Sequence, residues 1–193
     1  MYIRFDIRNK TYIRKLVLSG LFLALCLLLP FVTGQIQQIG QMLAPMHLPV
    51  LLCGLLCGWP YGLFCGIIGP ILSSLLSGMP PMAMLITMIP ELCVYGVVCG
   101  LVMRFLRTGR LYADLYCALI PAMIAGRLVG GIAKALLFMA TAQSYSLSLW
   151  ASSYFVVTLP GAILQLILLP AIVLVLTKAK LIPERYPAAS VGG

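Results

Sequence analysis

Charged side chains are absent from most of this 193-residue chain. Between Leu16 and Met103 there is no lysine or arginine, and Glu91 is the only acidic residue. Charged residues make up 9% of the whole sequence and hydrophobic residues 62%, whereas a soluble domain carries roughly 25% charged residues. A water-exposed surface needs such side chains every few residues. Their absence excludes a soluble domain and predicts an integral membrane protein.

The sequence also lacks the patterns on which several function classes depend. It contains no glycine-rich nucleotide-binding loop, so any use of ATP must come from a partner protein, and we expect no cofactor in this chain. It has one histidine, His47, and one acid within the apolar runs, Glu91, on different predicted helices. An intramembrane enzyme needs paired acids or a metal-ligand spacing. Such an enzyme is therefore the weaker alternative, together with a small channel or scaffold.

The seven cysteines do not suggest a metal site or a disulfide framework. All of them lie inside apolar runs except Cys117, which lies at the start of one. Cys53 and Cys57 are four residues apart and share a helix face, but no further ligand spacing accompanies them. We interpret the cysteines as small apolar side chains that fill space between helices.

Six apolar runs predict an all-α fold with six membrane-spanning helices in one domain. The runs cover residues 16–32, 42–58, 61–76, 82–105, 116–139 and 153–177, between a basic segment, 1–15, and a polar tail, 178–193. The second and third are short for a bilayer of about 30 Å. We expect a break at Trp59-Pro60 and either a tilt, a break near Pro70 or a local thinning of the membrane.

The net charge of +9 reflects membrane topology rather than nucleic-acid binding. Nearly all basic residues fall before the first run, between the fourth and fifth runs, or after the sixth. The loops at 33–41, 77–81 and 140–152 carry no charge. The positive-inside rule then places both termini in the cytoplasm, and an odd number of spans would put basic segments on opposite sides.

Four ionisable side chains lie within the spans, where burying such a group is costly, about 2.5–3.5 kcal/mol for Arg, Lys or Asp at a helix centre. Counted at about 1.5 Å per residue from the outer surface, His47 lies near that surface, Lys134 roughly 7 Å down, Glu91 roughly 13 Å and Arg127 roughly 18 Å. All four therefore fall in the outer half of the membrane, whereas a channel would also need polar groups in the inner half.

The polar residues fall on three helix faces that could meet in an outward-opening cavity. Arg127 and Lys134 share a face on which Gly130 and Gly131 leave room for a ligand or another helix. Polar residues of the fourth and sixth helices complete the predicted substrate-binding set: His47, Glu91, Tyr95, Arg127, Lys134, Thr158 and Gln165. Glutamines of residues 35–41 and polar and aromatic residues of 141–154 would form its lid.

Each of these residues also has a structural interpretation. Glu91 and Arg127 could neutralise each other, Lys134 could extend to the outer headgroups, and His47 could cap its helix. The aromatic residues of the outer loops could form an interfacial belt.

Small residues at helical spacing predict close helix packing in lipid. They occur as Gly54 and Gly58, Gly62 and Gly66, and Gly126, Gly130 and Gly131. Gly20 and Ala24 form a similar stripe on the first helix. That stripe either packs inside the protein or docks another membrane subunit.

The order of these motifs resembles the S components, the substrate-binding subunits of energy-coupling-factor (ECF) vitamin transporters. The resemblance covers about residues 16–177 and is carried by His47-Leu48-Pro49-Val50, the two Gly-x3-Gly pairs, Gly78-Met79-Pro80-Pro81, Glu91 with Tyr95 and Gly100, and Gly126-Arg127-x2-Gly130-Gly131. It implies a prokaryotic plasma-membrane protein that binds a vitamin-like micronutrient outside. It also implies a membrane coupling subunit, two cytoplasmic ATPases, and toppling of the S component to carry its ligand inward.

The resemblance further assigns the stripe on the first helix to docking of the coupling subunit. Family members commonly use two alanines four apart there, and Gly20 and Ala24 match them, with glycine in the first position. For the ligand, Arg127 and Lys134 exceed Glu91 by one positive charge, which a carboxylate or phosphate would balance. Among the family's ligands pantothenate fits this charge, while pyridoxine, cobalamin, queuosine precursors and folates stay open.

Overall fold

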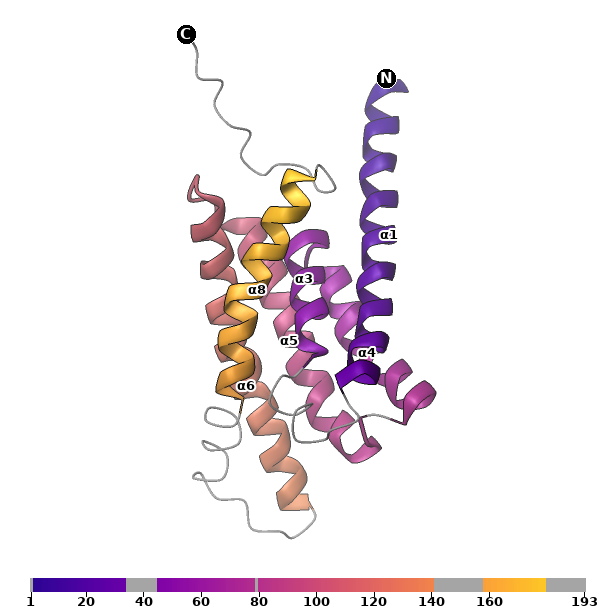
Figure 1. The fold of residues 1–193 in the computed structure, drawn as a ribbon, viewed down its shortest axis with the longest axis vertical. Coiled ribbons are helices and arrows are strands. Elements are labelled where there is room, and N and C mark those ends of the chain that lie inside the picture. The colour runs from indigo at the N-terminus through magenta and orange to yellow at the C-terminus, as the bar shows by residue number, and fades with distance from the viewer. Residues whose placement is uncertain (1, 34–44, 79, 141–157, 180–193) are drawn as a thin grey trace.

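The computed structural model describes residues 2–33, 45–78, 80–140 and 158–179 (Figure 1). These residues form six helices, which are α1 (Tyr2–Thr33), α3 (His47–Cys57), α4 (Trp59–Ser77), α5 (Met82–Phe105), α6 (Leu111–Ala140) and α8 (Leu159–Lys178). No strand occurs in the described ranges. Five helices are long and apolar enough to cross a membrane, and α3 is a shorter apolar helix. The predicted class, an all-α polytopic membrane protein, is confirmed.

The basic segments lie at one end of the bundle. In Figure 1 the beginning of α1, the beginning of α6 and the end of α8 all lie at the top, in indigo, rose and yellow. This arrangement is the one that an even number of crossings requires. With the positive-inside rule it makes this end the cytoplasmic one.

Two helices begin earlier than the apolar runs indicated. The first helix begins at Tyr2 rather than Leu16, and so includes the basic segment, because charged residues do not interrupt a helix that has left the hydrocarbon. α6 begins at Leu111 rather than residue 116. Asp114 accounts for this start, because its Oδ1 atom accepts hydrogen bonds from the Thr108 backbone N–H at 2.9 Å and hydroxyl at 2.7 Å.

The break between α3 and α4 falls at Gly58, one residue before the predicted Trp59-Pro60. Gly58 has a φ of 102°, a conformation that favours glycine. Trp59 and Pro60 instead begin α4, where proline is tolerated because a first-turn N–H has no helical partner. α4 then continues through Pro70 to Ser77, so no helix break occurs there.

Glycines bring α3, α4 and α5 into backbone contact around Gly96. A Cβ atom added at Gly54 would lie 2.6 Å from the Gly96 carbonyl oxygen, and one added at Gly62 would lie 2.7 Å from it. On the same side of α5, a Cβ at Gly100 would collide with the Trp59 backbone. The close approach predicted for Gly54 and Gly62 is confirmed, whereas Gly58 serves the turn.

The buried cysteines take part in the same packing. Cys26 of α1 and Cys65 of α4 place their sulfur atoms 3.7 Å apart, and both belong to the hydrophobic core together with Cys53 and Cys57. Their small side chains fit where helices meet closely, in keeping with the role as apolar fillers.

Candidate functional site

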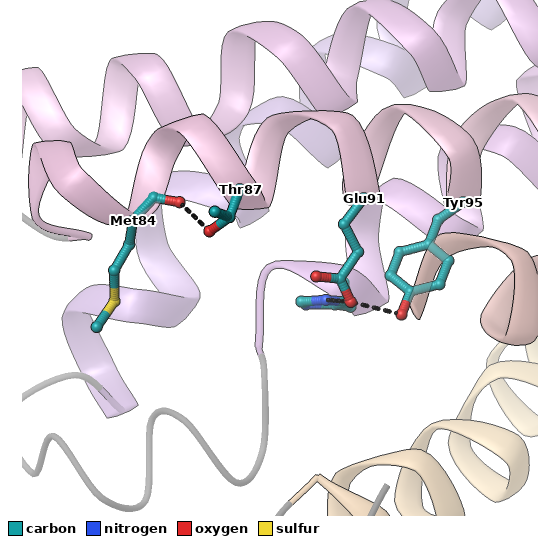
Figure 2. A network of polar contacts seen from close by, with 5 residues as sticks. Met84, Thr87, Glu91 and Tyr95 are labelled. Carbon is teal, nitrogen blue, oxygen red and sulfur yellow. Dashed lines mark hydrogen bonds and ion pairs between the residues drawn. The ribbon is translucent and has the colours of Figure 1, made fainter. Parts of the chain in front are cut away.

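A buried carboxylate lies at the centre of the polar residues in the bundle. The Oε1 atom of Glu91 accepts a hydrogen bond from the Tyr95 hydroxyl at 2.8 Å (Figure 2). The same oxygen lies 3.3 Å from the Nε2 atom of His47. The His47 and Tyr95 rings are also in contact, with centroids 5.0 Å apart and planes tilted by 59°. We refer to these three residues as the His47–Glu91–Tyr95 cluster.

Two helices position this cluster. Glu91 and Tyr95 are four residues apart on α5, so they lie on one face, one turn from each other. His47 is the first residue of α3, which packs along α5. Glu91 and Tyr95 are 8% and 2% exposed, so their polar atoms depend on one another for hydrogen bonds.

The backbone of α6 covers the cluster. A Cβ atom added at Gly130 would lie 2.7 Å from the Oε2 atom of Glu91, and one added at Gly126 would collide with the Tyr95 ring. The sequence predicted that glycines on this face leave room for a ligand or another helix. The structure shows the second outcome at Gly130, where the Glu91 side chain of α5 fills the space.

Arg127 and Lys134 lie half-buried on α6 beside this contact. Arg127 is close enough to interact electrostatically with the Tyr95 hydroxyl, and Lys134 also has an interaction partner. The Glu91 carboxylate makes its close contacts with His47 and Tyr95. Arg127 therefore places a positive charge beside the Tyr95 end of the cluster.

The remaining predicted residues come from α8. Gln165 is 5% exposed and faces the interior with Gly161, while Thr158 is half-buried directly before the helix begins. Both have interaction partners. The predicted lid segments, residues 35–41 and 141–154, lie outside the described residues.

His47 and Glu91 lie at the same level, which residue counting did not indicate. Counting placed it near the outer surface and Glu91 roughly 13 Å below. A contact of 3.3 Å puts the two side chains at the same level. The reason is that α3 has only 11 residues and its first residue, His47, lies beside Glu91.

The chemistry of the cluster suits binding. A buried carboxylate is stabilised by hydrogen bonds from a phenol and an imidazole, which offset part of the cost of removing its charge from water. Within the described residues no group of three or more His, Cys, Asp or Glu side chains could hold a metal ion. The cluster presents fixed polar atoms in apolar surroundings, the usual composition of a small-molecule site.

A family model described as ECF transporter, substrate-specific component, matches residues 14–173 of this chain. The chain belongs to this family. The match includes every residue of the His47–Glu91–Tyr95 cluster and most of the six helices. No curated protein and no solved structure matches the chain.

Membership makes the chain the substrate-specific subunit of an ECF importer, a multi-pass membrane protein, and the family is not one of enzymes. In this substrate-specific component, sequence reasoning missed the direct contact between His47 and Glu91. It also missed Gly96 of α5, which both α3 and α4 approach closely. The available signal was that the single histidine and the single acid of the spans are each other's only candidate for a close His–carboxylate pair.

Proposed function

We propose that this substrate-specific component binds a vitamin-like micronutrient from the outside at a site built on the His47–Glu91–Tyr95 cluster. The observation that carries the proposal is a buried carboxylate held by an imidazole and a phenol within spans that otherwise lack charge between Leu16 and Met103. Such groups are costly in a membrane and mark solute pathways in transport proteins.

The surrounding charges favour a substrate with one anionic group. Arg127 and Lys134 lie on the face of α6 that packs against the cluster, and their two positive charges exceed the single negative charge of Glu91. A carboxylate on the substrate would balance them. We therefore propose pantothenate, a compact carboxylate, as the first substrate to test.

We propose that α1 docks a membrane coupling subunit, which in turn works with two cytoplasmic ATPases at the prokaryotic plasma membrane. Gly20 and Ala24 are exposed, and a Cβ added at Gly20 would meet nothing within 4 Å. Gly20 also lines an apolar groove of ≈ 310 Å³ between α1 and α4. Such a surface lets a partner helix approach closely in lipid. ATP would be used by the ATPases and not by this chain.

The test is direct binding by the purified protein. Small molecules that co-purify are identified by mass spectrometry, and pantothenate, pyridoxine, folate and cobalamin are then titrated. We expect Arg127→Ala and Lys134→Ala each to weaken binding about tenfold, the value of one charge-assisted hydrogen bond. Arg104→Ala, an exposed arginine in the last turn of α5, is the control. If Arg127→Ala and Lys134→Ala bind as tightly as wild type and the Arg104→Ala control, the proposed site is rejected.

A further inference from the structure

One polar atom of the cluster has no hydrogen-bond partner among the described residues. Within the described part of the chain, the Nδ1 atom of His47 is buried and makes no hydrogen bond to a protein group. Nearly all buried polar atoms of folded proteins are hydrogen-bonded, and an exception calls for an explanation. Here the exception belongs to the residue that also contacts the buried carboxylate.

Glu91 determines which nitrogen of the ring carries the proton. The Oε1 atom of Glu91 already accepts the Tyr95 hydroxyl hydrogen, and a carboxylate oxygen can accept a further hydrogen bond. With Glu91 ionised and His47 neutral, the His47 Nε2 atom, 3.3 Å away, carries the hydrogen that is donated to Oε1. In a neutral imidazole the other nitrogen is an acceptor, so Nδ1 presents a lone pair.

The ring cannot exchange its two nitrogens without losing these contacts. The His47 side chain is 13% exposed and its ring contacts Tyr95 at a centroid distance of 5.0 Å. Rotation of the ring by half a turn would remove Nε2 from Glu91. The Nδ1 lone pair is thus held in one direction before any substrate binds, which lowers the entropy cost of a hydrogen bond to it.

We infer that Nδ1 of His47 accepts a hydrogen bond from a hydroxyl or amide N–H group of the substrate. This inference rests on the proposed function and narrows its substrate class. A carboxylate cannot donate to Nδ1, so the anionic group of the substrate belongs with Arg127 and Lys134. The substrate then carries two separate features, an anionic group and an uncharged hydrogen-bond donor.

Two substitutions of His47 separate its two nitrogens. Glutamine places an amide near the position of Nε2, and asparagine places one near the position of Nδ1. We expect His47→Gln to keep the contact with Glu91 and to bind pantothenate about tenfold more weakly, the loss of one hydrogen bond. We expect His47→Asn to keep more of the affinity than His47→Gln. Equal affinity of wild type and His47→Gln would overturn the inference.

A pantothenate analogue without its hydroxyl groups, and a second without its amide N–H, complete the binding test. Wild type should lose about tenfold toward one of them, and His47→Gln should bind that analogue and pantothenate equally. If His47→Gln still prefers pantothenate over that analogue as strongly as wild type does, a residue other than His47 accepts the hydrogen bond from the substrate. Thermal unfolding of both His47 variants in detergent checks that each is folded.

The chain has a single histidine, so its state can be measured without assignment. With ¹⁵N-labelled histidine, NMR at neutral pH should show the hydrogen on Nε2 and a bare Nδ1 whose resonance moves when pantothenate binds. A hydrogen on Nδ1 in the free protein would overturn the inference. If wild type binds none of the vitamins, the proposed function fails first, whereas binding unaffected by His47→Gln rejects this inference alone.

Discussion

The outer helix α1 and the central pair α5 and α6 use the same small residue in opposite ways. A Cβ added at Gly126 or Gly130 of α6 would meet Tyr95 or Glu91, whereas one added at Gly20 of α1 would meet nothing within 4 Å. Only 11% of the α1 membrane window is buried, against 44% of the α5 window. The central glycines close an interface inside the protein, and the glycine of α1 leaves a surface open.

This difference separates two tasks within one small bundle. In the central pair the backbone of α6 packs directly against the polar cluster. The geometry of the cluster therefore depends on the glycines Gly126 and Gly130. The first helix packs against α3 and α4 with one side and leaves Gly20 and Ala24 exposed on another. Substitutions in the central pair should therefore change stability and substrate affinity, whereas substitutions in α1 should change assembly with the coupling subunit.

The largest effect is expected at the centre of the bundle. Gly96→Val would place a side chain against the Gly62 backbone. Backbone atoms cannot relieve the clash by changing rotamer, as a side chain could. We expect the free energy of unfolding to fall by about 3 kcal/mol or more, at the upper end of overpacking effects. The measurement is the fraction of monodisperse protein after heating in detergent. Gly20→Val makes the same chemical change in open space, and equal losses in the two variants would contradict the comparison.

The next effect is expected at the buried carboxylate. Glu91→Ala would leave the Tyr95 hydroxyl and the His47 Nε2 atom without their shared partner. Two orphaned buried groups should lower stability by about 2–4 kcal/mol and substrate affinity by at least tenfold. Tyr95→Phe removes a single hydrogen bond and should cost about 1 kcal/mol. A Glu91→Ala protein as stable as Tyr95→Phe would mean that the cluster does not act as a unit.

A third substitution affects assembly instead of folding. Gly20→Leu should leave thermal stability and substrate affinity unchanged, because the added side chain points into open space. It should reduce co-purification with the coupling subunit and ATPases by at least tenfold, because a bulky residue keeps a partner helix away. Ala171→Leu, at an exposed position of α8, is the control for added bulk. Normal assembly of Gly20→Leu would reject α1 as the docking face.

The smallest effect is expected at the cytoplasmic end of α5 and α6. Asp114→Ala removes the acceptor of both Thr108 hydrogen bonds, so the loop before α6 loses its anchor. Stability should fall by about 1 kcal/mol, as for the loss of a helix-terminal hydrogen-bonding side chain, with no change in substrate affinity. A larger loss, comparable to that of Gly96→Val, would show that this loop matters as much for stability as the glycine contacts of α5 with α3 and α4.

Composition was enough to predict much of this fold. The apolar run of 82–105 predicted α5 with its observed bounds, and the basic segments predicted the end of the bundle at which they lie. These features follow from the free-energy cost of placing a charge in lipid. That cost depends on the type of each residue and not on its neighbours in the fold, so it can be read from the sequence. The beginning of α1 was not predictable in this way, because a helix can continue in water beyond the membrane.

The sequence allowed us to predict which residues belong to the site, but not which of them contact one another. Glu91 and Tyr95 lie one helical turn apart on one face, as their spacing requires. The contact between His47 and Glu91 depends on where the short helix α3 begins relative to α5, and no local sequence pattern encodes that position. Whether a glycine faces a neighbouring helix or open space is also a property of the packed bundle, which is why Gly20 and Gly130 look alike in the sequence.

The length of α1 has a mechanical consequence. Its 32 residues extend to about 48 Å at 1.5 Å per residue, well beyond the roughly 30 Å of hydrocarbon. Arg14 and Lys15 stand directly before its apolar part. Moving the helix outward by one turn would bring both cations into the hydrocarbon. The free-energy cost of burying these charges opposes that movement. Motion of α1 along the membrane normal is therefore restrained, while tilting about this anchored end is not.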